Sequence, residues 1–193
     1  MMNLDEVYWS SRYASGRTGW DIGYPSPPIT QYLDQLDNKS LKILLPGAGN
    51  AYEASYAFQK GFQNLFILDI AKAPLEKFKK ANPLFPAKQL IRDDFFNHNE
   101  TYDLVLEQTF FCALDPELRR DYVNKMHELI NPKGRLAGVL FNRKFDFQGP
   151  PFGGTEEEYR SYFSEKFDGV FASCYNSIPE RMGSELWINL RPK

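Results

Sequence analysis

The sequence has no hydrophobic run that approaches the roughly 20 apolar residues needed to cross a bilayer. Its first residues are polar and acidic, unlike a secretory signal. Only two cysteines occur, Cys112 and Cys174, and both lie in apolar surroundings. That usage favours buried free thiols in a reducing compartment. Together these features predict a cytoplasmic protein that has no membrane partner.

The chain also lacks an excess of charge of either sign. Its 193 residues include 23 Lys and Arg against 25 Asp and Glu, which gives a net charge of −2 at pH 7. A nucleic-acid binder usually carries a basic stripe that neutralises phosphates, whereas the densest basic stretch here, residues 77–80, fits the solvated face of a helix. The two histidines, His98 and His127, have no metal-ligand spacing with the cysteines. We therefore expect neither a nucleic-acid partner nor a metal site.

Aromatic residues are abundant, at 16% of the chain. Five rings precede a proline-rich stretch at residues 25–28; they belong to Tyr8, Trp9, Tyr13, Trp20 and Tyr24. So many rings in a turn-rich segment should pack over something, and a lid on a pocket is one candidate. The length fits one α/β domain. We predict a single domain over residues 1–193, with residues 1–40 as a lid segment, and the sequence selects no oligomeric state.

From residue 41 onward, apolar runs of strand length alternate with helical segments. The runs typical of strands buried on both faces are residues 41–45, 65–68, 102–106 and 136–141. The helical segments between them are residues 51–60, 74–81 and 116–130. In the last of these, Asp115 can cap the helix, Leu118 falls on its apolar side, and residues 131–134 stop it. This alternation predicts a doubly wound parallel sheet.

The C-terminal part differs from this alternation. A helix is expected over residues 155–166, followed by strands at residues 170–176 and 185–190. Because no helix separates the two strands, they predict a terminal hairpin that adds an antiparallel strand to the sheet.

A glycine-containing loop, residues 46–53, follows the first strand. In open α/β sheets, ligands bind at the carboxyl ends of the strands. Gly47 and Gly49 allow a tight turn and the close approach of a ligand. Glu53 near the following helix terminus would repel a pyrophosphate, but it suits a ligand with a cationic head, such as S-adenosylmethionine (SAM). The alternative is an ordinary tight turn between a strand and a helix.

Acidic residues stand at two later strand ends. Asp69 ends the second strand, where a carboxylate can accept both ribose hydroxyls of an adenosine. After a third strand, residues 89–91, Asp94 and Phe95 can bond an adenine amino group and cover its face. The alternatives are a helix cap for Asp69 and a polar turn before core phenylalanines for the other pair. Together with the loop, these residues indicate a nucleoside site.

Both NAD and SAM fit such a site, so the candidate catalytic residues must show which of the two cofactors is used. Tyr56 and Lys60 have the spacing used by short-chain dehydrogenases, but they lie on the helix directly after the loop and point away from the strand ends. No nucleophile elbow or Walker loop indicates a hydrolase or NTPase. SAM is therefore favoured. A nicotinamide-dependent oxidoreductase and a non-catalytic SAM-binding module remain as alternatives.

The chain resembles the thiopurine S-methyltransferase family, most closely its branch of plant halide and thiol methyltransferases. The matching strings span nearly the whole chain: residues 8–13 (YWSSRY), 18–23 (TGWDIG), 46–53 with Asp69, 94–96 (DFF), 107–116 (EQTFFCALDP) and 149–152 (GPPF). TGWDIG and TFFCA are specific in combination, whereas the glycine loop is not. The resemblance implies a Rossmann-like class I SAM methyltransferase with a seven-stranded, mostly parallel sheet, a C-terminal antiparallel hairpin and an N-terminal aromatic lid.

The resemblance also implies which residues bind SAM. From the N-terminal lid, the cofactor would be covered by Trp9, Tyr13 and Trp20. The methionine portion would lie on Gly47, Ala48 and Gly49, the ribose on Asp69, and the adenine on Asp94 and Phe95. Glu107, at the tip of the fourth strand, would lie near the amino group of the methionine portion.

The chain departs from the family pattern at three places. Ala51 stands where the family loop commonly has glycine, and Glu107 stands where the related branch usually has aspartate. The thiopurine enzymes use arginines near the acceptor, whereas the tip of the fourth strand offers residues 108–111 (QTFF). That last difference argues against an anionic purine thiolate as the acceptor.

Methyl transfer from a sulfonium is an in-line displacement, which needs alignment and a dry pocket. A halide or thiolate arrives as an anion and needs no general base. We expect catalysis by positioning and desolvation, with Thr109 or Tyr13 orienting the nucleophile. The expected substrate walls are Phe110, Phe111 and Phe152, although plain core packing is the alternative for the first two. The predicted function is SAM-dependent methylation of a small-molecule soft nucleophile: a thiol, hydrosulfide or halide.

Overall fold

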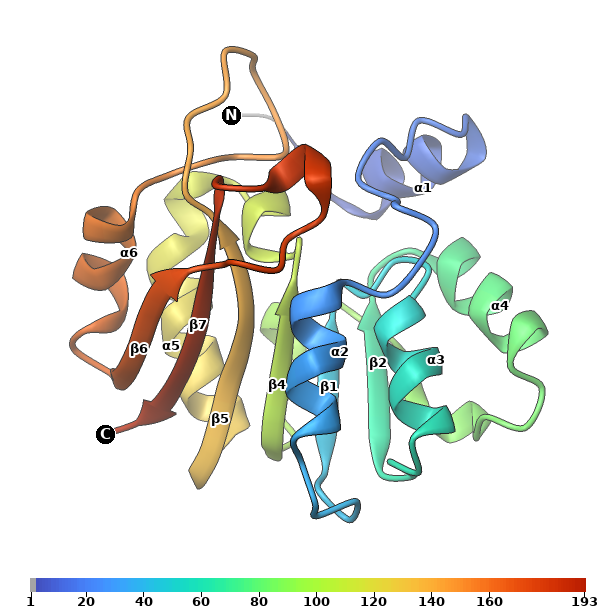
Figure 1. The fold of residues 1–193 in the computed structure, drawn as a ribbon. Coiled ribbons are helices and arrows are strands. Elements are labelled where there is room, and N and C mark those ends of the chain that lie inside the picture. The colour runs from blue at the N-terminus through green and yellow to red at the C-terminus, as the bar shows by residue number, and fades with distance from the viewer. Residues whose placement is uncertain (1–2) are drawn as a thin grey trace.

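The computed structural model describes residues 3–193, and its seven strands form one mixed sheet (Figure 1). The strand order is β3-β2-β1-β4-β5-β7-β6. The strands are β1 (Ile43–Pro46), β2 (Leu65–Asp69), β3 (Leu90–Arg92), β4 (Tyr102–Gln108), β5 (Ile130–Phe141), β6 (Phe167–Ser173) and β7 (Glu185–Pro192). The first five run parallel, and β7 lies antiparallel between β5 and β6. The predicted doubly wound sheet with a C-terminal antiparallel hairpin is confirmed.

Helices cover both faces of the sheet (Figure 1). The helices are α1 (Glu6–Ala14), α2 (Pro27–Asp34), α3 (Tyr52–Gln59), α4 (Lys72–Ala81), α5 (Arg119–Leu129) and α6 (Glu156–Phe163). One apolar core joins α2, α3 and α4 to the sheet, and a second joins α5 and α6 to the opposite face. The residues of β1 alternate between these two cores, so all four are buried. This two-sided burial explains why the parallel strands are continuous apolar runs.

The segment before residue 41 is more helical than its turn-rich sequence indicates. The Asp5 side chain caps α1 by accepting a hydrogen bond from the Tyr8 N–H at 3.0 Å. Helix α2 begins at Pro27 and buries Ile29 and Leu33 completely in the core. Within the described residues of the predicted lid, α1 lies toward the carboxyl ends of the parallel strands and α2 belongs to a core layer. Residues 1 and 2 of that lid lie outside the described residues.

The region around α5 differs from its predicted single helix over residues 116–130. Asp115 accepts a hydrogen bond from the Glu117 N–H, as expected of a cap, but the first turn is a separate 3₁₀ helix, Pro116–Leu118. Leu118, at the end of that turn, is 37% exposed and belongs to neither apolar core, so the prediction that it packs with the apolar side of the helix is wrong. Residues 131–134 follow the helix as predicted, but they belong to β5.

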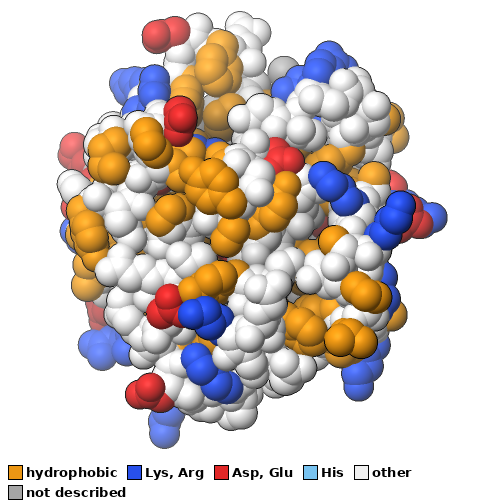
Figure 2. Space-filling model, turned by 45° about the vertical axis from the view of Figure 1, so that its right-hand side comes forward, with side chains coloured by type: hydrophobic (Ala, Val, Ile, Leu, Met, Phe, Trp, Pro, Cys, Tyr) orange, Lys and Arg blue, Asp and Glu red, His pale blue; other side chains and the backbone are white. Residues whose placement is uncertain are grey.

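No helix within residues 3–193 combines the length and the apolar character needed to cross a bilayer. Cys112 and Cys174 are both buried free thiols. On the face shown in Figure 2, hydrophobic side chains form one group around the centre and above it and a second group at the lower right, and Lys and Arg are scattered around both.

Candidate active site

A cavity of about 930 Å³ lies at the carboxyl ends of β1, β2 and β4. The strand order reverses between β1 and β4, and such a switch point is where open α/β sheets bind ligands. The walls come from residues 4–24, the glycine loop, the tips of β2 and β4, and two C-terminal segments, residues 141–151 and 180–184. Segments distant in sequence therefore meet at the top of Figure 1.

The glycine loop has the backbone geometry that its sequence predicts. Gly47 and Gly49 have φ angles of +56° and +53°, which favour glycine. A Cβ atom at Gly47 would lie 2.0 Å from Cδ2 of Phe110, so no side chain fits there. At Gly49 a Cβ atom would lie 3.1 Å from the Tyr13 hydroxyl oxygen. The loop is thus closely covered by the lid on one side and by the tip of β4 on the other.

Asp69 lies at the tip of β2, on the cavity wall, and is only 5% exposed. Its Oδ2 accepts a hydrogen bond from the Gly49 N–H at 2.9 Å, and its Oδ1 accepts one from the Ala71 N–H at 2.8 Å. Each carboxylate oxygen has capacity for a further donor. Burial raises the pKa of Asp69 to about 6, although the two N–H donors act in the opposite direction. The carboxylate therefore orders the loop and still has acceptor sites for a pair of hydroxyls.

The predicted lid rings lie together on the cavity wall. Trp20 packs edge-to-face against Trp9 and Tyr13, with ring centroids 5.5 and 5.7 Å apart. Burial raises the pKa of the Tyr13 hydroxyl, which keeps it neutral. The Arg181 guanidinium donates to the Trp20 carbonyl oxygen at 3.1 Å, so the lid is also held from the β6–β7 connection.

Asp21 joins the lid to the glycine loop. Its Oδ2 accepts a hydrogen bond from the Asn50 side-chain amide at 2.5 Å and one from the Tyr52 hydroxyl at 3.5 Å. Sequence reasoning did not select Asp21, although the TGWDIG string contains it. Glu53, which also lines the cavity, accepts from the Ser26 N–H at 2.9 Å, and burial raises its pKa. Two carboxylates therefore attach the N-terminal segment to the loop and its helix.

Asp94 and Phe95 line the cavity beside the tip of β3, and Ala48 and Thr109 also lie on its wall. Asp94 Oδ1 accepts a hydrogen bond from the Phe96 N–H at 2.9 Å. Phe95 is 3% exposed and packs edge-to-face against Phe110, with ring centroids 5.1 Å apart. The adenine pair predicted from sequence is thus next to the predicted substrate wall.

Three predicted site residues do not line this cavity. Glu107 is fully buried, and its carboxylate turns away from the cavity toward the backbone that follows it and toward α5. Phe111 packs in the core against Tyr122 and Tyr159, so its core interpretation holds. Phe152 does not lie on the wall, and its N–H donates to the Cys112 carbonyl oxygen at 2.7 Å. The three residues therefore lie off the cavity wall, whereas the sequence predicted ligand contacts for them.

The aromatic wall is completed by residues that sequence reasoning missed. Phe141, Phe145 and Phe147 line the cavity from the end of β5 and the segment after it. We call residues 142–154 the acceptor segment. The sequence signal in this segment was the GPPF string with Phe152, and nothing in the sequence indicated Phe145 or Phe147, because no periodic element contains them and their position depends on contacts with distant helices.

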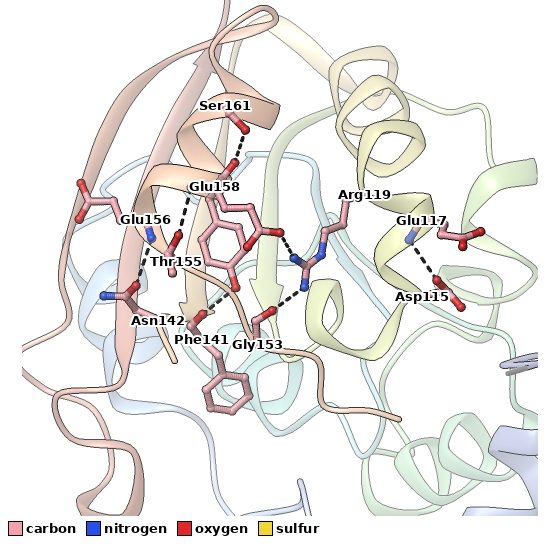
Figure 3. Close-up of polar contacts among 11 residues, drawn as sticks. Asp115, Glu117, Arg119, Phe141, Asn142, Gly153, Thr155, Glu156, Glu158 and Ser161 are labelled. Carbon is pink, nitrogen blue, oxygen red and sulfur yellow. Dashed lines mark hydrogen bonds and ion pairs between the residues drawn. The ribbon is translucent and has the colours of Figure 1, made fainter. Parts of the chain in front are cut away.

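Arg119 is the main polar anchor of the acceptor segment (Figure 3). It is 2% exposed, donates to the Gly153 carbonyl oxygen at 2.7 Å, and pairs with Glu158 at 2.5 Å. The Gly154 N–H donates to the Arg143 carbonyl oxygen at 3.0 Å, and the Tyr159 hydroxyl donates to the Phe141 carbonyl oxygen at 2.7 Å. The start of α5 and the start of α6 thereby hold both ends of the segment.

Three arginines reach the cavity: Arg12 from the lid, Arg143 from the acceptor segment and Arg181 from the β6–β7 connection. The guanidinium of Arg143 lies over the Phe145 ring at 4.8 Å from its centroid. The tip of β4 carries no arginine, as the sequence indicated, but other segments bring arginines to the cavity, which weakens the argument against a purine thiolate. These arginines come from segments that only the tertiary fold brings to the cavity.

Comparison with known sequences gives a family match over most of the chain. The family model described as thiopurine S-methyltransferase (TPMT) matches residues 4–184. The probable thiol methyltransferase 2 of Arabidopsis thaliana is 31% identical over 156 residues, which cover 78% of this chain and 69% of that protein. The thiopurine S-methyltransferase of Acinetobacter baylyi is 24% identical over 190 residues, covering 86% of each chain.

Comparison with solved structures agrees on the fold. The 1,6-didemethyltoxoflavin-N1-methyltransferase of Burkholderia thailandensis, solved with bound 1,6-didemethyltoxoflavin and S-adenosylhomocysteine, superposes with a TM-score of 0.77 at 16% identity. That match covers 97% of this chain and 87% of the other. A TehB-like SAM-dependent methyltransferase from Corynebacterium glutamicum gives a TM-score of 0.66 at 15% identity, covering 97% and 98%. At these identities the likeness concerns the fold.

Proposed function

The chain belongs to the thiopurine S-methyltransferase family and is a SAM-dependent methyltransferase, and we propose that its acceptor is a small soft nucleophile: a thiolate, hydrosulfide or halide. The observation that carries the proposal is one cavity that joins a nucleoside-binding carboxylate, Asp69, to a chamber walled by Phe110, Phe141 and Phe145.

The residues present fit SAM. Gly47 and Gly49 lie on the cavity wall and turn the loop through positive φ angles, so the methionine portion can approach the backbone of the loop. Asp69 has acceptor capacity for the ribose hydroxyls, and Asp94 and Phe95 lie where the adenine would bind. Trp9, Tyr13 and Trp20 would cover the cofactor, and Glu53 offers a negative charge for its ammonium group.

When bound, SAM supplies an electrophilic methyl group on a sulfonium. The chain's own residues hold the nucleophile in line with the methyl–sulfur bond, a geometry that can contribute several kcal/mol to rate acceleration. The rings of the chamber exclude water from the nucleophile. The hydroxyl of Thr109 or of Tyr13 orients it, since both line the cavity and Tyr13 stays neutral.

Soft anions suit the charge of the chamber. Arg143 places positive charge on its wall, which favours a thiolate or halide over a neutral amine, whereas the charge of Arg181 is paired with Glu185 at 3.5 Å. A thiolate is already a nucleophile at neutral pH, so no general base is needed. The relatives are named for thiol, thiocyanate and thiopurine methylation, which agrees with this class of acceptor.

We propose a small molecule as the only partner needed for turnover, and the cytoplasm, which keeps Cys112 and Cys174 reduced, as the location.

A panel of nucleophiles tests the proposal. The enzyme is incubated with SAM and, separately, iodide, thiocyanate, hydrosulfide, a small alkyl thiol and a purine thiol. Methylated products are measured by headspace gas chromatography or by mass spectrometry. We expect turnover with at least one soft nucleophile and none with alcohols or amines of similar size. SAM binding without transfer to any soft nucleophile would overturn the proposal and would favour a non-catalytic SAM-binding module.

A further inference from the structure

The turn that follows β4 contains a strained residue on the cavity wall. Thr109 has a φ angle of +55°, and within residues 3–193 the only other non-glycine residue with a positive φ is Ala51. A β-branched residue in this region is a genuine outlier, because its Cβ substituents meet the backbone. Such strain persists only where surrounding contacts enforce it.

The carboxylate of Glu107 enforces this turn. Its Oε1 accepts hydrogen bonds from two consecutive backbone donors, the Phe110 N–H at 2.8 Å and the Phe111 N–H at 2.9 Å. Its Oε2 accepts one from the Tyr122 hydroxyl at 2.5 Å, which ties the carboxylate to α5. One oxygen thus binds both amides, and the carboxylate bridges the turn in which Thr109 has its left-handed conformation.

Close packing against β5 fixes the backbone from which the Glu107 side chain projects. A Cβ atom at Gly138 on the neighbouring strand β5 would lie 2.0 Å from the Glu107 carbonyl oxygen and 2.6 Å from its Cβ. Phe110, the next residue after the strained one, lies over Gly47 of the glycine loop. The turn therefore fixes the cavity wall at the place where the methionine portion of SAM would meet the acceptor chamber.

We propose that Glu107 is a positioning residue for methyl transfer: it holds Thr109 and Phe110 so that the nucleophile stays in line with the methyl–sulfur bond. This inference rests on the proposed function. Glu107 acts from behind the wall and touches neither cofactor nor acceptor. Its removal should lower kcat strongly and leave the dissociation constant for SAM nearly unchanged, since a misplacement of about 1 Å near the reacting atoms can cost about 100-fold in rate.

Substitutions at Glu107 itself test the proposal first. Glu107→Met keeps the volume and removes both acceptors, so we expect kcat to fall about 100-fold. Glu107→Gln keeps one oxygen for the two amides, and we expect it to retain kcat within about fivefold. SAM affinity measured by calorimetry should change less than about threefold in both. A folded Glu107→Met enzyme with wild-type kcat would overturn the inference. Failure of SAM binding or of all turnover in the wild type would instead count against the proposed function.

A matched pair of tyrosines keeps the test informative if Glu107→Met does not fold. Tyr122→Phe removes the hydroxyl that binds Glu107 from α5, whereas Tyr102→Phe removes a buried hydroxyl that bonds His98 at the opposite end of β4. Each variant loses one buried hydrogen bond, so the free energy of unfolding should fall by a similar amount in both. We expect kcat to fall about tenfold in Tyr122→Phe and less than twofold in Tyr102→Phe. Equal kcat values in the two variants would contradict the positioning role.

Discussion

At the scale of single residues, the site depends on one carboxylate that serves both loop and ligand. Asp69 accepts the N–H groups of Gly49 and Ala71, so it orders the glycine loop before any ligand arrives. The same side chain offers the remaining acceptor sites to the ribose. Preorganisation of this kind lowers the entropy lost on binding.

Substitution of Asp69 should weaken cofactor binding without unfolding the protein. Asp69→Ala removes two charge-assisted hydrogen bonds to the ribose, which are worth about 2–4 kcal/mol together, or a rise in the dissociation constant of about 30- to 1000-fold. Calorimetry measures the affinity, and circular dichroism checks the fold. Asp37→Ala, at an exposed aspartate, is the control and should bind SAM as the wild type does. Unchanged affinity in Asp69→Ala would show that Asp69 only caps the loop and the helix.

The raised pKa of Asp69 makes SAM affinity depend on pH. With a pKa of about 6 in the free enzyme, the carboxyl is ionised at pH 8 and mostly protonated at pH 5. Protonation removes acceptor capacity, so the dissociation constant for SAM should rise about tenfold between these two pH values. Asp69→Asn should bind weakly with a nearly flat profile. An equally steep profile in Asp69→Asn would assign the titration to another group, such as Glu53.

At the scale of elements, the acceptor wall depends on a segment without regular structure. The acceptor segment is held at its ends by Arg119 on α5 and by the first turns of α6 (Figure 3). Arg119 also stacks over Phe111 at 5.2 Å and over Tyr159 at 5.7 Å. A buried cation with several partners therefore fixes the position of Phe145 and Phe147 relative to the strand tips.

Removal of this cation should affect the acceptor side alone. Arg119→Met keeps the apolar stem and loses the bonds to Gly153 and Glu158, which we expect to cost about 2–4 kcal/mol of unfolding free energy, less than a fully buried pair because Glu158 is partly exposed. The acceptor KM should rise while SAM affinity stays constant. The control is Arg160→Ala, which breaks an exposed pair with Glu156 and should cost at most about 1 kcal/mol. Equal losses of stability in the two variants would contradict the anchoring role.

Whether an element could be predicted depends on whether a local feature of the sequence, such as an apolar run or a cap, determines it. The parallel strands and the C-terminal hairpin were predictable because burial on two faces produces continuous apolar runs. The cap by Asp115 was predictable because it acts over three residues, whereas the 3₁₀ turn that exposes Leu118 was not visible in the apolar pattern. Helices α1 and α2 were not predicted. Both are short, so the apolar periodicity of each is brief, and the aromatic residues and prolines of this segment indicated turns instead.

The candidate site likewise has a half that the sequence predicts and a half that it predicts poorly. Its cofactor half could be predicted because Gly47, Asp69 and Asp94 follow strands directly, and parallel strands end at the same edge of the sheet. Its acceptor half could be predicted only at the tip of β4, where Thr109 and Phe110 lie, since Arg143 and Phe147 reach the cavity through contacts between distant segments. The sequence places Glu107 at the correct strand tip. The direction of its carboxylate, away from the cavity, depends on the turn that it stabilises.

At the scale of the whole molecule, buried carboxyls make the free enzyme sensitive to pH. Burial raises the pKa values of Asp69 and Glu107 to about 6 and about 7, and those of Glu53 and Glu185 rise as well. A carboxyl with a raised pKa binds its proton more tightly in the folded state than in the unfolded state. Its contribution to stability is therefore present at low pH and is lost as pH rises through the folded pKa.

The free enzyme should consequently be less stable at pH 8 than at pH 5, by a few kcal/mol at most. SAM carries positive charge and interacts with the ionised carboxyls, so its stabilising effect should be larger at pH 8. Thermal unfolding with and without SAM at the two pH values measures both effects. A free enzyme whose Tm rises from pH 5 to pH 8 would contradict the burial of these groups.

The central claim, that the strand-tip cavity holds the adenosyl group beside a ring-walled acceptor chamber, is tested most directly by a crystal structure with S-adenosylhomocysteine. We predict that the ribose hydroxyls will lie within hydrogen-bonding distance of the Asp69 carboxylate and that the sulfur will face Thr109 and Phe110. An adenosyl group bound elsewhere, or a cavity filled by the lid side chains with the ligand excluded, would contradict the account.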